Sequence, residues 1–377
     1  MGVSIREIID SYNANAPLAE ASTPPASWYV DARIAELERR TVFSRSWQLV
    51  GRADQLREPG QYLTCELAGN PILVVRGKDG VLRGFYNVCR HHAAAVLTEP
   101  EGKTENLRCP YHGWTYDLSG KLVVAPEFGG VRNFDPGANG LVSVETAIWE
   151  NWVFVKLERG GPSLEDFLTP DLIGRIRELE IDKYHWVERR RYTLDCNWKI
   201  FVDNYLDGGY HVPHLHRGLN SVLAPAQYKI ETGERFCLQS SPMIADKAEP
   251  QTAAARKGDR ALYYWIYPNF MINWYEGVMD TNLVCPRGAD RTEVIFDFYF
   301  ADISESARER NLASIAVSER IQAEDVAICE SVQRGLASRA YMAGRLSVRR
   351  EAGEHLFHRL LYADLNAGIS NEDSSKQ

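Results

Sequence analysis

Two pairs of cysteine and histidine stand close together in the sequence and have the side chains to bind metal. The first pair is Cys89 and His91, and the second is Cys109 and His112. Each pair offers one thiolate and one imidazole. Two thiolates on one iron and two imidazoles on the other are the ligands of a Rieske [2Fe–2S] cluster. A structural zinc site uses the same donors, but its ligands usually come as Cys–Cys and His–His pairs, so the mixed pairs favour the cluster.

A second concentration of ligand residues lies between residues 197 and 216, where three histidines occur at positions 211, 214 and 216. We expect this stretch to begin as a helix and to end at Pro213. If it is helical as far as the proline, Asp203, Asp207 and His211 share one face, because they are spaced by four residues. Two histidines and one carboxylate form the facial triad of non-haem Fe(II) enzymes, which leaves positions open for oxygen and substrate.

The third ligand of such a triad has to come from another part of the chain. A long amphipathic helix is expected from about Ser304 to Leu336, and Asp325 falls within its apolar stripe of Ile321, Ile328, Val332 and Leu336. A carboxylate that faces a core is costly unless it is paired or binds a metal. Asp325 is therefore the predicted third ligand, and the alternative is a buried salt bridge to Arg334 or Arg345.

The composition describes an ordinary globular protein. The chain has 377 residues, with 43 Lys and Arg against 51 Asp and Glu, and 45% of its residues are hydrophobic. Without a basic surplus it is not expected to bind nucleic acid or an anionic membrane. The sequence shows neither a membrane-spanning apolar stretch nor a secretory signal, so we expect a cytoplasmic protein. It also lacks a nucleotide-binding glycine motif, so electrons from NAD(P)H should arrive through a separate reductase.

The elements that position these residues differ along the chain. Short β-rich runs, interrupted by glycine and proline, predict a small β-domain between residues 46 and 160. Helices and aromatic strands alternate after it, which predicts an α+β domain over residues 161–377. Asp31 is expected to cap a helix in the N-terminal segment, residues 1–45. The polar stretch 241–260 is expected to be a surface loop or a mobile lid.

Several motifs together resemble one known family, the α subunits of the Rieske non-haem iron oxygenases. They are Asn87–His92, Cys109–Trp114, the Asp203–Asn204 block with its two later histidines, and Glu324–Glu330. The resemblance implies an all-β Rieske domain (46–160) inserted in a helix-grip, START-like catalytic domain (1–45 and 161–377). It implies a [2Fe–2S] cluster on Cys89, His91, Cys109 and His112, and a mononuclear Fe(II) on His211, His216 and Asp325. His214 competes with His216, but the family's spacing favours His216.

The family also implies a homotrimer, in which the cluster of one subunit supplies electrons to the iron of its neighbour through an acidic residue. That acid usually stands three residues before the first iron histidine, where this chain has Gly208. Asp207, one position earlier, is the expected bridge, and Asp203 is the alternative. Asn204, in the same motif, is expected at the catalytic site. O2 is the implied co-substrate, and a flavin and iron–sulfur reductase is the implied partner; whether a β subunit is present stays open.

Within the family, residues 203–213, 267–271 and 279–283 resemble choline monooxygenase and related quaternary-ammonium oxygenases. An aromatic run supplies candidates for a cation pocket, with Glu276 or Asp280 as a nearby carboxylate. The candidate substrate residues are Trp265, Tyr267, Phe270 and Trp274. Core packing explains the same aromatic pattern through strand alternation. The alternative activities are an aromatic-ring hydroxylase or O/N-demethylase acting on a neutral or anionic substrate, and an electron-transfer protein without oxygen chemistry.

Overall fold

The chain forms two compact units in its computed structural model, which describes residues 3–244, 252, 255–256 and 258–375. One unit comprises residues 1–42 and 168–377, and the other comprises residues 43–167. Much of the predicted loop or lid at 241–260 lies outside the described residues. Among the described residues, no helix is long and apolar enough to span a membrane.

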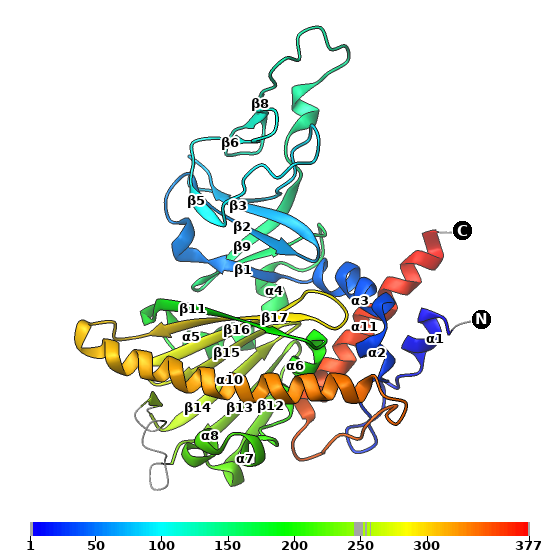
Figure 1. The fold of residues 1–377 in the computed structure, drawn as a ribbon, viewed down its shortest axis with the longest axis vertical. Helices are drawn as coiled ribbons and strands as arrows, with labels where there is room; N and C mark the ends of the chain where they lie inside the picture. The colour runs from blue at the N-terminus through cyan, green and yellow to red at the C-terminus, as the bar shows by residue number, and fades with distance from the viewer. Residues whose placement is uncertain (1–2, 245–251, 253–254, 257, 376–377) are drawn as a thin grey trace. The chain divides into compact units, whose positions relative to one another are not determined.

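The unit of residues 43–167 is built from β-strands (Figure 1). Its larger sheet has the order β1-β10-β9-β4-β3-β2-β5, and its smaller sheet has the order β6-β7-β8. In β3, residues 72–75 are completely buried, so this run is apolar without alternation. The strands are β1 (Gln48–Arg52), β2 (Gln61–Leu67), β3 (Asn70–Arg76), β4 (Leu82–Tyr86), β5 (Glu101–Lys103), β6 (Leu107–Arg108), β7 (Thr115–Tyr116), β8 (Leu122–Val124), β9 (Ser143–Trp149) and β10 (Trp152–Lys156).

The other unit contains one antiparallel sheet of seven strands in the order β11-β17-β16-β15-β14-β13-β12. Neighbouring strands from β12 to β17 follow each other in the chain. Short turns connect all of these neighbours except β13 and β14, which are joined by residues 243–259. The strands are β11 (His185–Leu194), β12 (Lys229–Thr232), β13 (Phe236–Pro242), β14 (Arg260–Ile266), β15 (Phe270–Tyr275), β16 (Val278–Pro286) and β17 (Thr292–Phe300). With its helices, this sheet confirms the predicted α+β class.

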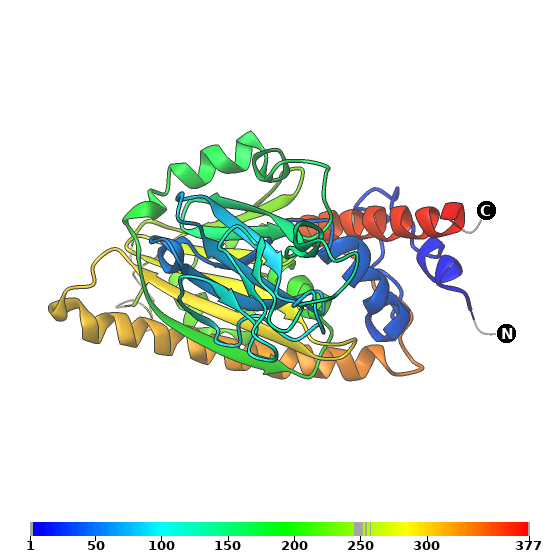
Figure 2. The same ribbon diagram turned by 90° about the horizontal axis from the view of Figure 1, so that it is seen from above.

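Helices of the same unit pack on this sheet, and the longest, α10 (Arg308–Leu336), runs along it in both ribbon views (Figures 1 and 2). The helix α6 (Trp198–Leu206) contacts α10, β16 and the C-terminal helix α11 (Ala352–Ser375). The shorter helices are α1 (Ile5–Asp10), α2 (Ser27–Val30), α3 (Ala32–Glu38), α5 (Pro170–Arg177), α7 (Val212–Leu215) and α8 (Arg217–Val222). In the sequence, α4 (Leu164–Leu168) includes the last residues of one unit and the first residue of the other. Asp31 caps α3 by accepting a hydrogen bond from the Arg33 backbone N–H, as predicted.

The helix after residue 197 is shorter than predicted. It ends at Leu206, because Gly208 and Gly209 have φ angles of +68° and +66°, which a right-handed helix does not allow. Pro213 does not terminate it but lies within the first turn of α7, where proline is well tolerated. The predicted continuous face with Asp203, Asp207 and His211 is therefore wrong.

Candidate metal centres and catalytic cavity

The two Cys–His pairs lie on two loops with matching backbone geometry. In the first loop the Cys89 N–H donates to the carbonyl of Ala94, and the Ala93 N–H donates to the carbonyl of Cys89. In the second loop Cys109 pairs in the same two ways with Trp114 and Gly113. Ala93 and Gly113 each stand four residues after the cysteine and have φ of +60° and +73°. Each loop therefore folds back on itself at the same point after its cysteine.

The side chains of these loops suit a [2Fe–2S] cluster. Both sulfurs are buried, since Cys89 is 3% exposed and Cys109 is 2% exposed. The rings of His91 and His112 lie 4.7 Å apart, and the buried Nδ1 of His91 has no hydrogen-bond partner. A buried ring nitrogen without a partner is costly unless it binds something that the protein itself does not supply. A cluster iron would satisfy it.

The side chains of His211, His216 and Asp325 meet in the other unit, where one donor atom from each lies within 4.8 Å of the other two. The first histidine precedes α7, the second stands between α7 and α8, and Asp325 lies on α10. The Nε2 of His216 is 3.1 Å from the Oδ1 of Asp325. Two atoms bound about 2.1 Å from one ion at a right angle are about 3.0 Å apart, so the spacing suits a shared metal.

Hydrogen bonds hold two members of this group in position. The Nδ1 of His216 is 2.6 Å from the Oε2 of Glu324, which leaves Nε2 to face Asp325. The amide of Asn204 donates to Asp325 at 2.8 Å. Burial acts to lower the pKa of His216, but the hydrogen bonds and charges of Asp325 and Glu324 outweigh it and raise this pKa. The alternative salt bridge to Arg334 or Arg345 is not formed, because Asp325 bonds instead to Asn204 and His216.

Replacing Glu324 with glutamine should weaken metal binding at this site without removing a ligand. The glutamine side-chain amide can still form a hydrogen bond to His216, but it lacks the negative charge that stabilises the ring electrostatically. Loss of such an outer partner typically costs about 10- to 100-fold in metal affinity. Titration of the apo protein with Fe(II) or Co(II) measures this change. The exposed Glu309→Gln on the same helix is the control, and an unchanged affinity in Glu324→Gln would contradict the positioning role.

Asp207 contacts the first histidine directly. Its Oδ2 is 2.6 Å from the Nδ1 of His211 and accepts the His211 backbone N–H at 2.9 Å. The usual position of the family's bridging acid, Gly208, has no room for a side chain, because a Cβ there would lie 2.1 Å from the carbonyl oxygen of Arg350. Asp203 faces a different cluster, where it accepts a hydrogen bond from Tyr29 and contacts His358. Asp207 is thus the acid in contact with the triad.

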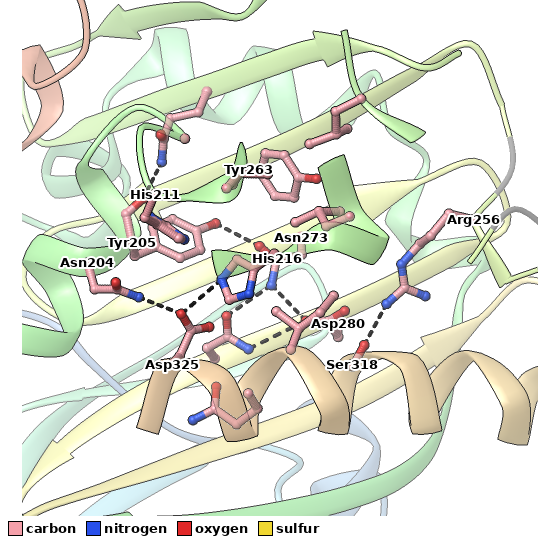
Figure 3. A pocket seen from close by; sticks show the side chains of 18 of the residues that line it. Asn204, Tyr205, His211, His216, Arg256, Tyr263, Asn273, Asp280, Ser318 and Asp325 are labelled. Atoms are coloured by element: carbon pink, nitrogen blue, oxygen red, sulfur yellow. Dashed lines mark hydrogen bonds and ion pairs between the residues drawn. The ribbon is translucent and has the colours of Figure 1, made fainter. Parts of the chain in front are cut away.

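A cavity of about 110 Å³ opens onto His211, His216 and Asp325 (Figure 3). One row of partners in neighbouring strands forms part of its wall: Gln239, Tyr263, Asn273 and Asp280. Helix α10 supplies Ser318, Ile321 and Gln322, and the rings in the lining are Phe201, Tyr205, Tyr228, Tyr263, Tyr275 and Phe296. The cavity thus combines aromatic faces with a few polar groups and with the candidate iron ligands.

The four aromatic residues chosen from the sequence do not line this cavity. Trp265 shares a strand face with Tyr263, but α11 covers it, and its ring lies 5.5 Å from that of Phe357. Tyr267 lies beyond the end of β14 and donates to Asp364 of α11. Phe270 and Trp274 alternate with Asn273 in β15, so they point to the opposite face of the sheet. For these four residues, the core-packing alternative fits the structure better.

Sequence reasoning missed several residues that line the cavity. Tyr205 directly follows Asn204 in the recognised motif and donates to the Oδ1 of Asn273 at 2.8 Å, so the motif itself was a usable signal. Asp280 was named only as one of two nearby carboxylates; it lines the cavity, whereas Glu276 does not. Arg256 lies in the polar stretch 241–260, which has no periodic pattern, so nothing in the sequence singled it out.

Comparison with sequence families gives two matches in succession. The model of the Rieske [2Fe-2S] domain matches residues 46–135, and that of the ring hydroxylating alpha subunit (catalytic domain) matches residues 181–365. Choline monooxygenase of Arabidopsis thaliana is 40% identical over 372 residues, which cover 96% of this chain and 87% of that protein. The carnitine monooxygenase oxygenase subunit of Escherichia coli (strain K12) is 33% identical and covers 91% of this chain and 93% of its own.

Solved structures show the same architecture. A quaternary ammonium Rieske monooxygenase in complex with L-carnitine superposes with a TM-score of 0.81 at 28% identity, covering 94% of this chain and 98% of that one. Naphthalene 1,2-dioxygenase from Rhodococcus sp., at 22% identity and a TM-score of 0.77, shares the fold over 92% of this chain and 94% of its own. The chain therefore belongs to the α subunits of the Rieske non-haem iron oxygenases, whose cofactors are a [2Fe–2S] cluster and a mononuclear iron.

Proposed function

We propose that this chain is the oxygenase component that hydroxylates a C–H bond of a small quaternary ammonium compound, such as choline, carnitine or glycine betaine. The observation that carries the proposal is the cavity at His211, His216 and Asp325, which joins tyrosine rings to the buried carboxylate of Asp280. A quaternary ammonium has no N–H to donate, so aromatic faces and a carboxylate are the groups that recognise it. Relatives named choline and carnitine monooxygenases support this substrate class.

The metal centres are assigned as follows. Cys89, His91, Cys109 and His112 hold the [2Fe–2S] cluster within a domain of residues 46–160. His211, His216 and Asp325 hold the mononuclear iron in the catalytic domain of residues 1–45 and 161–377. When bound, these groups supply the electrons and the oxygen activation that hydroxylation requires. The substrate C–H, O2, two electrons and two protons give the alcohol and water, with the electrons coming from NAD(P)H.

The protein's own groups orient the reaction. Glu324 fixes the ring of His216, and the Asn204 amide holds Asp325. Aromatic walls exclude water around the substrate carbon, which protects the reaction from wasteful side reactions. Asp207, in contact with His211, is the bridge to the cluster of a neighbouring subunit in a homotrimer. A separate flavin and iron–sulfur reductase in the cytoplasm delivers the electrons.

A single-turnover experiment tests the proposed substrate class. Chemically reduced protein loaded with Fe(II) is exposed to O2 together with choline, L-carnitine, glycine betaine and a set of aromatic acids. Mass spectrometry should detect oxidation of at least one quaternary amine. Oxidation of the aromatic compounds alone would contradict the proposed substrate class and would leave the family assignment unchanged.

Replacing Cys89 with alanine should abolish the visible absorbance of the cluster, because one iron loses a thiolate ligand. Mononuclear iron binding in the other unit should persist, since none of its ligands is changed. Absorbance and circular dichroism of the purified protein measure the cluster. Cys65→Ala, in β2 of the same unit, is the control and should keep the full spectrum; retention of the spectrum in Cys89→Ala would contradict the ligand assignment.

A further inference from the structure

One cationic side chain in the catalytic cavity has no role in the mechanism described above. Arg256 lines the cavity and is only 4% exposed. Its guanidinium donates to the hydroxyl of Ser318 at 2.5 Å and to that of Ser314, both on α10. It also lies 4.8 Å from the centre of the Tyr275 ring. These contacts hold the guanidinium in one place, facing the cavity.

The guanidinium is incompletely satisfied. Its buried Nε has no hydrogen-bond partner. Within the described part of the chain, the guanidinium contacts two serine hydroxyls and a tyrosine ring and forms no ion pair with a carboxylate. The carboxylate of Asp280, whose pKa the charge of Arg256 acts to lower, accepts instead from the amides of Asn273 and Asn282. Because a guanidinium stays charged in proteins, this arrangement leaves a buried cation with an unused donor.

The distance between Arg256 and the triad follows from α10, because the helix carries both Ser318, which binds Arg256, and Asp325. Ser318 precedes Asp325 by seven residues, and seven residues of helix rise about 10 Å. Figure 3 shows Arg256 at the far end of the cavity from Asp325, with Asp280 between them. A substrate that reaches from the triad to Arg256 therefore passes Asp280.

The charges of the cavity favour a ligand that carries both signs. Burial raises the pKa of Asp280, while the charge of Arg256 and the two asparagine amides act to lower it. A purely cationic ligand beside Asp280 would leave the guanidinium unpaired and would be repelled by it. A ligand with a cationic and an anionic end pairs both groups and adds no net charge to a buried site.

We propose that Arg256 is a carboxylate anchor, which makes the preferred substrate a zwitterion with a quaternary ammonium at one end and a carboxylate at the other. The carboxylate pairs with the charge of the guanidinium and accepts from the N–H groups that Ser314 and Ser318 leave free. The ammonium faces Asp280 and the tyrosine rings, which places the carbon next to nitrogen toward the triad. This inference rests on the proposed function and narrows it from quaternary amines in general to those with a carboxylate.

Glycine betaine and choline form the matched pair that tests the anchor. They share the trimethylammonium group and the chain length, but glycine betaine ends in a carboxylate and choline ends in an alcohol. We expect the wild-type protein to oxidise at least one of three carboxylate-bearing compounds, glycine betaine, γ-butyrobetaine and L-carnitine, more efficiently than choline. Its kcat/KM should be about 10- to 100-fold above that of choline, which is the range expected for a charge-assisted hydrogen bond. Arg256→Met should remove this preference mainly by raising KM. Arg256→Lys should restore part of it.

Two controls separate the anchor from general damage. Arg260→Met, whose guanidinium stacks on Trp274 outside the cavity lining, should leave the preference unchanged. The iron content and the cluster absorbance of Arg256→Met should match those of wild type, which shows that the variant is folded and loaded. Choline oxidised as well as the carboxylates, or an equal loss on all substrates in Arg256→Met, would overturn the anchor while the proposed function stands. If no quaternary amine is oxidised, the proposed function itself fails.

Discussion

The Asp207→Ala variant is expected to lose almost all steady-state turnover while keeping both metal centres. Asp207 is not among the seven proposed metal ligands, but its carboxylate is 2.6 Å from the His211 ring. In the proposed homotrimer, removing it breaks the proposed route between His211 and the cluster of the neighbouring subunit, so electrons should no longer reach the iron. The measurements are the visible spectrum, the iron content per chain and product formation with the reductase and NAD(P)H.

The control for this variant is Asp203→Asn, because Asp203 is the alternative bridge. Its carboxylate bonds to Tyr29 and His358, away from His211, so turnover should stay within a few-fold of wild type. Loss of turnover in Asp203→Asn, together with normal turnover in Asp207→Ala, would reverse the assignment. Loss of the iron in Asp207→Ala would show instead that the residue holds the site together.

The second large effect is expected for Asp325→Ala, which should empty the mononuclear site and abolish hydroxylation. The change removes the only carboxylate of the proposed triad. It also leaves the half-buried amide of Asn204 and the buried Nε2 of His216 without their partner, and for the buried group this costs about 1–3 kcal/mol in folding stability. Iron analysis should show loss of the mononuclear iron alone, and the cluster spectrum should be unchanged.

Glu309→Ala provides the control on the same helix, since Glu309 is exposed in the first turn of α10. It should behave like wild type in iron content and activity. If the Asp325→Ala protein retains its mononuclear iron, the assignment of Asp325 as a ligand is wrong and another residue must take its place. Thermal unfolding of both variants shows whether stability, rather than metal binding, accounts for any loss of activity.

Much of the architecture could be predicted from the sequence because local chemistry determines it. The spacing of Cys89 with His91 and of Cys109 with His112 indicates one kind of centre, and the family matches confirm the Rieske domain. Asp325 stood out because a carboxylate in an apolar stripe that faces the core needs a partner. Ile328 and Val332 of that stripe are exposed in the structure, but Asp325 does lie beside His216. These are short-range patterns, which the sequence records directly.

The path of the chain after α6 was predicted less well. A helical spacing placed Asp203, Asp207 and His211 on one face, but the left-handed backbone of Gly208 and Gly209 separates them. Glycine at these positions is compatible with both a weakened helix and a turn. The close approach of the Arg350 carbonyl to Gly208, from a segment far along the chain, decides between them.

The sequence by itself determined the family, the two-centre chemistry and the residue types that carry it. Only the tertiary structure decided which aromatic and charged residues face the substrate. Trp265 and Tyr263 lie on the same face of one strand, yet Trp265 is covered by α11 whereas Tyr263 lines the cavity. No sequence pattern around Arg256 indicates a functional role, and its place in the cavity depends on hydrogen bonds to Ser314 and Ser318 on α10. Strand alternation specifies a face, whereas the helix that packs over that face depends on contacts between residues distant in sequence.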